Sequence, residues 1–145
     1  MSLYAAGRTT GLVVDSGDGV SHTVPVFEGF SVPHAVEKMD IAGRVLTNYL
    51  QKLLLESIAE GFTSTAELEI VKSIKEDLCY VASSYDAEKA QAIASSENDK
   101  PYTLPDKRVL NIPGSVRIQC PELLFKPELN GKSCKGLHQL TWQSV

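Results

Sequence analysis

The sequence predicts a mixed α/β fold, on three observations. Two segments rich in β-branched residues, Thr9 to Val14 and Val20 to Phe27, flank the turn-forming stretch DSGDG, which is typical of a β-hairpin. Apolar residues then recur at helical spacing from Ile41 to about Ala59, and again after Ser64. Short strand patterns return between residues 102 and 113. The chain therefore contains both helices and strands.

The length and charge of the chain exclude several classes of protein. Its 145 residues suit one ordinary domain with a sizeable core. A net charge of -4 and a pI near 5.3 leave no concentrated basic surface for nucleic acid. No apolar run reaches the roughly 18 residues of a membrane span, and the N-terminus MSLYAAGR lacks a signal peptide's apolar region. We expect a cytoplasmic protein that binds neither nucleic acid nor membrane.

The three cysteines, Cys79, Cys120 and Cys134, are odd in number and share no CxxC spacing. Neither a disulfide framework nor a zinc site is therefore predicted. We expect reduced and mostly buried thiols.

The two long helices are predicted from their apolar stripes. Gly61 interrupts the first helical pattern, and Ser64 with Glu67 forms a capping box that opens the second helix. The first helix should bury Val45, Leu46, Tyr49, Leu50, Leu53, Leu54 and Ile58. The second should bury Ile70, Val71, Ile74, Leu78 and Val81. This leaves Lys72, Lys75 and Glu76 clustered on a wetter face of the second helix.

The remaining segments are short. Residues 86–100 are polar and predict a loop or a weak surface helix. YTLP and RVLNIP predict two strands joined by a DK turn, and CPELLF predicts a brief helix opened by Pro121. The last segment, LHQLTWQSV, has the pattern of a helix still in progress. We therefore expect the chain to be a fragment of a longer protein.

The DSGDG turn has two interpretations. As a plain hairpin turn, its Asp and Gly residues accept the positive φ angles of tight turns. As a phosphate site, Gly17 and Gly19 would let phosphate oxygens approach the backbone amides, while Asp15 and Asp18 would hold Mg²⁺, often through water. The turn alone does not decide between them.

Three further signals are equally ambiguous one by one. His22 could orient a water toward a terminal phosphate, or could be an ordinary hydrogen-bonded histidine. The Lys72, Lys75 and Glu76 cluster could receive the base and ribose of a nucleotide, or could be a solvated helix face. Gly43, at the start of a helix, could admit a ligand to free amides, or could serve packing or capping.

Taken together and in order, GRTTG, DSGDGV, IKEDLCYVA, YTLPD and CPELLF resemble the actin family. The similarity runs from Ser2 to the end of the chain and corresponds to the middle of an actin. It implies part of one α/β lobe of the actin-like ATPase fold, which is ribonuclease H-like, with an inserted helical subdomain. Residues 1–41 would form part of the base subdomain, 42–131 the helical insert with its short strands, and 132–145 the return to the base.

The resemblance also implies the roles of individual residues. Asp18, Gly19 and Val20 would contact phosphates, Asp15 and Asp18 would hold hydrated Mg²⁺, and His22 would help to organise the attacking water. Gly43, Lys72, Lys75 and Glu76 would line the adenosine pocket. Lys72 stands where an arginine is expected, which weakens a stacking or bidentate contact.

The function implied by the resemblance is that of an ATP-binding cytoskeletal protein that assembles into filaments with other actin subunits and meets actin-binding proteins. Since the first phosphate hairpin and the opposing wall are absent, the isolated chain should bind ATP poorly and should not hydrolyse it. Lys132 and Lys135 make a loop polar that is more apolar in actins, so an interface there would rely on charge. A non-filament actin-related scaffold is the alternative, and a stand-alone enzyme of the sugar-kinase class is a more distant one.

Overall fold

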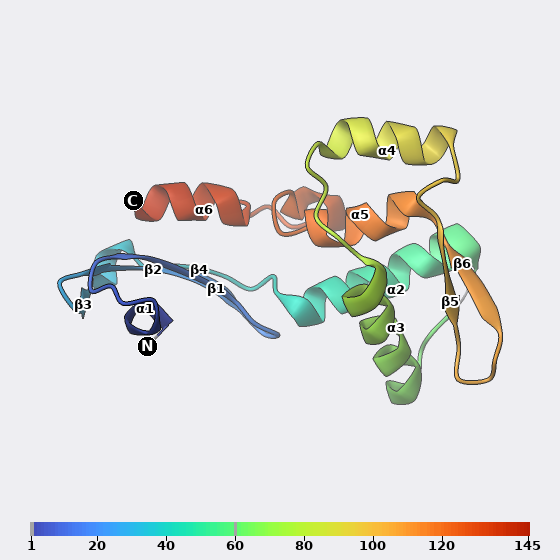
Figure 1. Ribbon diagram of the computed structural model, residues 1–145, viewed down its shortest axis with the longest axis horizontal. Coiled ribbons are helices and arrows are strands. Elements are labelled where there is room, and N and C mark those ends of the chain that lie inside the picture. The colour runs from blue at the N-terminus through green and yellow to red at the C-terminus, as the bar shows by residue number, and fades with distance from the viewer. Residues whose placement is uncertain (1, 60) are drawn as a thin grey trace. The chain divides into compact units, whose positions relative to one another are not determined.

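The computed structural model describes residues 2–59 and 61–145 (Figure 1). The predicted ranges 1–41 and 42–131 also include residues 1 and 60, which lie outside the described residues. The chain divides into two compact units. The first comprises Met1–Val45 with Leu124–Val145, and the second comprises Leu46–Leu123. The predicted division places the boundaries at 41/42 and 131/132, and the assignment of these units to actin subdomains stays a prediction.

The first unit is built on an antiparallel sheet. The strands are β1 (Gly11–Ser16), β2 (Ser21–Phe27), β3 (Phe30–Ser31) and β4 (Glu37–Met39). β2 is central and pairs with each of the other three. Asp15 lies opposite His22, so the predicted hairpin is confirmed.

Short helices complete the first unit. They are α1 (Ser2–Ala5), the 3₁₀ helices η1 (Pro33–Ala35) and η2 (Pro127–Asn130), and α6 (Leu137–Ser144). α6 packs against β2 and β4, which confirms the predicted C-terminal helix. The buried hydroxyls of Thr23 and Ser144 are hydrogen-bonded to each other, which ties α6 to the middle of the sheet. The core of the unit includes Met39, Ile41 and Leu140.

The second unit is mainly helical (Figure 1). Its elements are α2 (Gly43–Ile58), which begins in the first unit, α3 (Thr65–Leu78), α4 (Tyr85–Ala94), β5 (Lys100–Thr103), β6 (Val109–Ile112) and α5 (Gly114–Glu122). β5 and β6 form the predicted hairpin, and α4 lies along α5. The largest fully buried side chains of this unit include Leu50, Leu54, Ile74, Ile112, Ile118 and Leu123.

The predicted helices are largely confirmed. α2 buries the expected Leu46, Tyr49, Leu50, Leu53 and Leu54, while the expected Val45 and Ile58 are half-buried. α3 has the predicted capping box, with both hydrogen bonds between Ser64 and Glu67 present. Residues 86–100 include α4, which buries none of its side chains and is thus the weak surface helix of the two alternatives. Burial of Val81 was wrong, because α3 ends at Leu78 and Val81 is 54% exposed beyond it.

The prediction that Pro121 opens a helix was also wrong. Pro121 lies inside α5, near its C-terminal end. A proline there cannot donate to the carbonyl four residues earlier, which belongs to Arg117. That carbonyl instead accepts the backbone amide of Tyr80 at 3.2 Å. A tertiary contact therefore compensates for the missing helical hydrogen bond.

The three cysteines are all free, as predicted. Cys120 is buried and Cys79 is half-buried, but Cys134 is exposed, in contrast to the expectation of mostly buried thiols.

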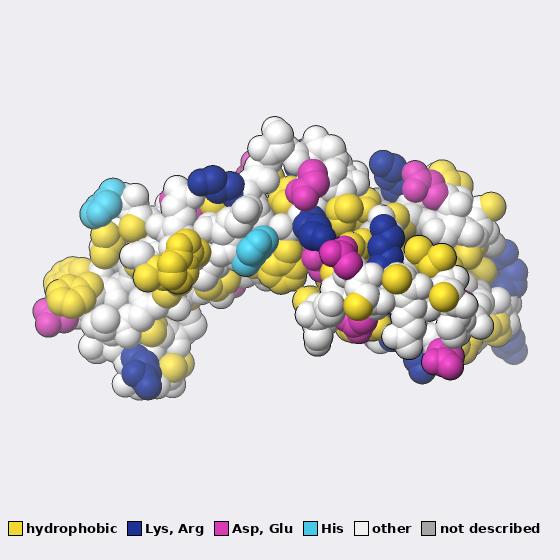
Figure 2. All heavy atoms as spheres, turned by 90° about the horizontal axis from the view of Figure 1, so that it is seen from above, with side chains coloured by type: hydrophobic (Ala, Val, Ile, Leu, Met, Phe, Trp, Pro, Cys, Tyr) yellow, Lys and Arg dark blue, Asp and Glu magenta, His cyan; other side chains and the backbone are white. Residues whose placement is uncertain are grey.

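None of the helices in the described part of the chain combines the length and apolar character that a membrane span requires. On the face drawn in Figure 2, Lys and Arg side chains are interspersed with Asp and Glu side chains.

Candidate functional site

The turn between β1 and β2 is the candidate site in the first unit. The amide of Gly17 donates to the carbonyl of Val20 at 3.1 Å, which closes the turn and places Asp18 and Gly19 at its tip. Residues 15–19 are all exposed. Gly17 and Gly19 do not have the positive φ expected of glycines in a tight turn. The conformational reason for the two glycines is therefore wrong, which leaves the other predicted reason, room for an anion to approach the backbone.

The open space around the turn supplies that reason. A Cβ at Gly19 would meet nothing within 4 Å, and one at Gly17 only the Val20 carbonyl at 3.9 Å. The backbone amides of Asp18, Gly19 and Val20 donate no hydrogen bond to any acceptor among the described residues. Consecutive amides of this kind in a turn form a concavity that suits an anion. At the two glycines, no side chain fills the space beside these amides.

Two carboxylates and one imidazole flank these amides. Asp15 Oδ2 lies 3.9 Å from Nε2 of His22, its partner across the hairpin. Asp18 Oδ2 accepts hydrogen bonds from Nε and Nη2 of Arg44, at 3.2 and 3.1 Å. The two aspartate side chains are 65% and 62% exposed, whereas His22 is only 34% exposed. Asp15 and His22 therefore face each other across the hairpin, and Asp18 lies on the turn that joins their strands.

The turn is fixed to the start of α2 by backbone hydrogen bonds. The amide of Gly43 donates to the Gly17 carbonyl at 2.9 Å, and the amide of Arg44 donates to the Asp18 carbonyl at 2.8 Å. The buried hydroxyl of Ser21 donates to the Ile41 carbonyl at 2.8 Å. The sequence suggested that the Gly43 amide could be open to a ligand, but it is used to hold the turn. These bonds preorganise the turn against the helix.

The charged cluster on α3 belongs to the second unit. Lys72 and Glu76 are exposed and Lys75 is half-buried, which confirms the wetter face predicted for them. The Lys75 ammonium donates to Oγ1 of Thr47 on α2 at 3.0 Å. Thr47 is itself buried. The Lys75 side chain is therefore held in place, whereas its two neighbours project into solvent.

The donor groups bear on which metal the turn could hold. Among the described residues, no group of three or more His, Cys, Asp and Glu side chains is arranged to hold a metal ion. Mg²⁺ keeps several of its waters and is commonly held by one or two carboxylates with substrate phosphates. Asp15 and Asp18 fit that limited role. They do not fit a metal held by protein side chains alone.

A comparison with protein-family models matches residues 1–145 to the family described as Actin. The chain belongs to the actin family. The observed mixture of small antiparallel sheets and helices is that of part of an actin-like lobe, as predicted. The family match covers both units, and thus both the turn and the α3 cluster.

Two residues of these sites escaped sequence reasoning. Arg44 carries a positive charge in the first turn of α2, where the helix dipole disfavours cations, and this could have signalled a nearby carboxylate. Thr47 gave no signal, because its partner Lys75 lies 28 residues away on another helix. The site residues carried over from the actin family remain predictions.

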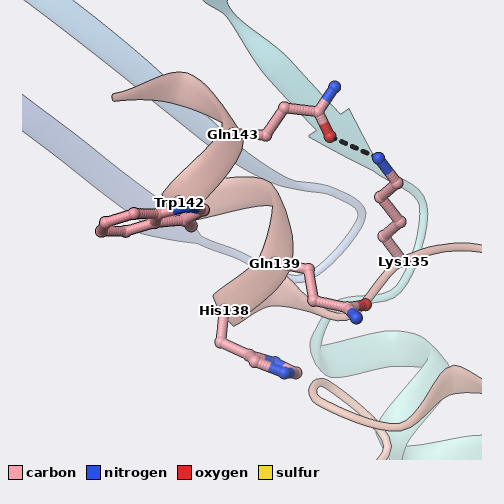
Figure 3. Close-up of a pocket in the computed structure, with 5 residues that line it drawn as sticks. All are labelled: Lys135, His138, Gln139, Trp142 and Gln143. Atoms are coloured by element: carbon pink, nitrogen blue, oxygen red, sulfur yellow. Dashed lines mark hydrogen bonds between the residues drawn. The ribbon is translucent and has the colours of Figure 1, made fainter.

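The loop that precedes α6 is also relevant to an actin family protein. Lys132 and Lys135 are exposed, and they line a cavity of about 400 Å³ together with Lys38 and Asp40. Lys135 also borders a second cavity, of about 610 Å³, where its ammonium donates to Gln143 at 2.7 Å (Figure 3). Trp142 lines the same cavity and is 81% exposed. This surface combines positive charge with an exposed aromatic ring.

Proposed function

We propose that the turn from Asp15 to His22 binds the phosphate groups of ATP with hydrated Mg²⁺, within a longer actin family protein whose subunits assemble into filaments. The observation that carries this proposal is the row of three amides, from Asp18 to Val20, that donate to no described acceptor beside two exposed carboxylates. Membership of the actin family supports the choice of a nucleotide over other anions.

Each group on the turn has a role in this proposal. The amides of Asp18, Gly19 and Val20 donate to phosphate oxygens, and the missing side chain of Gly19 admits them. Asp15 and Asp18 hold the metal through its water shell. For Asp18 to do so, its carboxylate must share or release Arg44, whose guanidinium is itself a suitable partner for a phosphate. ATP binding would therefore rearrange the Arg44 side chain.

His22 would orient the water that attacks the terminal phosphate. Its imidazole is the most enclosed of the three side chains on the turn, and Asp15 faces its Nε2 at 3.9 Å. This contact limits the positions that the ring can adopt. His22 can then hold or accept a proton of the water when the rest of the site is present.

Lys72, Lys75 and Glu76 would contact the adenosine. Lys75 is held by Thr47 in a fixed position, which reduces the entropic cost of binding. Lys72 is exposed and supplies a point charge where the family pattern has a planar guanidinium. Gly43 would contribute by its lack of a side chain, because its amide already donates to Gly17.

Nuclear magnetic resonance of the labelled chain with MgATP tests the turn directly. We expect weak binding, since several charge-assisted hydrogen bonds worth about 1.5–3 kcal/mol each would be missing. The amide resonances of Asp18, Gly19 and Val20 should nevertheless move with ATP, and Asp18→Ala should abolish the shifts. Asp106→Ala, which removes another exposed aspartate paired with an arginine, is the matched control. Movement of other resonances with these three unchanged would refute the site.

The activity of the chain gives a second test. We expect no ATP hydrolysis above background from residues 1–145, measured as released phosphate. Micromolar affinity for MgATP in calorimetry would show that the turn needs no opposing wall. Weak binding without hydrolysis would identify the turn as part of a larger site, whereas micromolar affinity would show that the turn suffices for binding.

The alternative function is an actin-related scaffold that binds nucleotide without forming filaments. The charged loop with Lys132 and Lys135 favours it, because a filament contact there would have to bury ammonium groups or pair them. Pelleting and electron microscopy of the full-length protein, with and without ATP, separate the two. Filaments that form in the presence of ATP would support the first proposal, and a protein that binds nucleotide but forms no filaments would support the second.

A further inference from the structure

Cys79 and Cys120 belong to two segments of the second unit that are hydrogen-bonded to each other, because both neighbours of Cys79 are bonded to Arg117. Cys79 is the first residue after α3, and Cys120 is in α5. Each thiol is the strongest influence on the pKa of the other, so the two side chains are neighbours. Cys120 is buried and its Sγ also lies 3.4 Å from the Leu46 carbonyl, whereas Cys79 is half-buried. One sulfur of the pair is thus near the surface and the other is in the core.

The contact is held by Arg117, which lies one helical turn before Cys120. Its Nε donates to the Leu78 carbonyl at 2.7 Å, and its own carbonyl accepts the Tyr80 amide at 3.2 Å. The guanidinium also lies over the Tyr80 ring, 4.9 Å from its centre. The residues on both sides of Cys79 are therefore bound to α5, which fixes Cys79 beside Cys120.

The surroundings give the two thiols different reactivity. The pKa of Cys79 is lowered, first by the hydrogen bond from Cys120 and then by the charges of Arg117 and Lys75, which outweigh its burial. The pKa of Cys120 is raised by the same hydrogen bond and by burial. A thiolate is the reactive form of cysteine, so Cys79 is the nucleophile of the pair.

We propose that Cys79 and Cys120 are an oxidative modification site, which hydrogen peroxide converts to an intrachain disulfide. The Cys79 thiolate attacks one peroxide oxygen, the O–O bond breaks, and sulfenic acid forms with release of hydroxide, which takes up a proton to become water. Sγ of Cys120 then attacks Sγ of Cys79, and the displaced hydroxide leaves as water with the Cys120 proton. In total two thiols lose two hydrogens and one peroxide becomes two waters.

The backbone around Cys79 allows the bond to close. A disulfide requires the sulfurs to approach to about 2.05 Å, closer than two sulfurs that are not bonded. Cys120 is fixed in α5, but Cys79 has extended backbone angles, with φ -78° and ψ 144°, at the start of a segment that joins α3 to α4. The Cys79 side chain can therefore turn toward Cys120 while the residues on both sides of it stay bound to α5. Two thiols alone do not complete a tetrahedral zinc site, and no third ligand joins them within residues 2–59 and 61–145.

Peptide mapping of the chain after peroxide treatment tests the proposal. Free thiols are blocked with N-ethylmaleimide, and linked peptides are identified by mass spectrometry. We expect loss of two of the three free thiols, with Cys79 linked to Cys120 and Cys134 still alkylated as a free thiol or singly oxidised. Dithiothreitol should restore both thiols. The Cys134→Ser variant should give the same link, because this exposed thiol takes no part.

Two further measurements keep the result interpretable. Cys120→Ser should trap sulfenic acid at Cys79, detected as a dimedone adduct. When the chain is unfolded in urea and treated in the same way, it should no longer favour the Cys79–Cys120 disulfide. Disulfides that include Cys134 should then form as well. If the folded chain yields separately oxidised Cys79 with Cys120 still free, or equal amounts of all links, the proposal is overturned. None of these outcomes depends on nucleotide binding, so the site and the proposed function fail or stand separately.

Discussion

Arg44 donates two hydrogen bonds to a single carboxylate oxygen of Asp18, from Nε at 3.2 Å and from Nη2 at 3.1 Å. The backbones of the same two residues are also joined, by the Arg44 amide and the Asp18 carbonyl at 2.8 Å. The positive charge lies in the first turn of α2, where the helix dipole opposes it. The carboxylate of Asp18 offsets that cost and completes the attachment of the turn to the helix.

Arg44→Ala should lower the free energy of unfolding by less than about 1 kcal/mol, because both side chains are well exposed and solvent screens the pair. Urea unfolding at low and at high salt measures this. The difference from the wild type should shrink with salt. Asp18→Ala and the double variant complete the cycle that isolates the pair. A loss of several kcal/mol would mean that the backbone link between turn and helix depends on the side chains.

Gly136 precedes α6 at a point where the chain has no room for a side chain. A Cβ there would overlap the backbone carbonyl of Phe125 and would approach Cε1 of His138 to 2.8 Å. The Phe125 ring also packs against the His138 ring, with centroids 5.7 Å apart. Since backbone cannot rotate away as a side chain can, Gly136→Ala should destabilise the first unit by about 1–3 kcal/mol.

The matched control for this change is Gly19→Ala. A Cβ at Gly19 meets nothing within 4 Å, and its φ is not positive. Its effect on thermal unfolding should stay within about 0.5 kcal/mol. Equal effects of the two variants would contradict this explanation, because only Gly136 lacks room for a Cβ.

Arg117 joins three segments of the second unit. Besides the Leu78 carbonyl, it donates from Nη1 to the Asn98 carbonyl at 2.5 Å. Arg117→Met keeps most of the apolar stem but leaves both half-buried carbonyls without this donor. We expect a loss of about 1.5–3 kcal/mol in urea unfolding.

Arg117→Lys separates charge from geometry. A lysine keeps the charge, but its single ammonium cannot reproduce the planar fork that reaches two carbonyls. We expect it to recover little of the lost stability. Arg108→Met is the control, since Arg108 is an exposed partner of Asp106 and should matter little. Full recovery with lysine would show that charge, and not the fork, holds the segments together.

The elements that local patterns define were predictable from the sequence. The capping box needs only Ser64 and Glu67, and the β1–β2 hairpin needs only its turn and its β-branched flanks. Pro121 was misplaced because local rules exclude proline from a helix, and only the distant Tyr80 amide makes it tolerable in α5. The Thr47 partner of Lys75 is a similar long-range contact. Such contacts depend on packing, which one sequence does not reveal.

The candidate site was predictable in its residues but not in its bonding. The spacing of Asp15, Asp18 and His22 pointed to one hairpin, and the structure places Asp15 opposite His22 on its strands and Asp18 on its turn. That the Gly43 amide is already bonded could not be predicted, because any helix start has free amides until the fold supplies acceptors. Of the two interpretations of the turn glycines, positive φ is wrong, and the open space around them is compatible with the other, the approach of an anion.

Tyr85, the first residue of α4, gives a prediction about pH. Burial, followed by the neighbouring Tyr49, Glu122 and Asp86, raises the pKa of Tyr85 from 10.0 to about 12. Lys89 also lies over its ring, 5.7 Å from the centre. The folded state thus keeps the phenol protonated to higher pH than the unfolded state does. This contribution to stability is complete below pH 10 and is lost as the pH rises toward 12.

Tyr85→Phe removes the titrating group and keeps the ring. The difference in free energy of unfolding between the wild type and this variant therefore reports on the phenol. Urea unfolding of both proteins at about pH 9 and about pH 11 should show the wild type losing more stability between the two values than the variant does. Lysines that titrate in the same range affect both proteins alike, and so cancel in the comparison. Tyr4→Phe, at an exposed position of the first unit, controls for loss of any tyrosine hydroxyl. Parallel losses in wild type and Tyr85→Phe would mean that the phenol ionises equally well in the folded and unfolded chains.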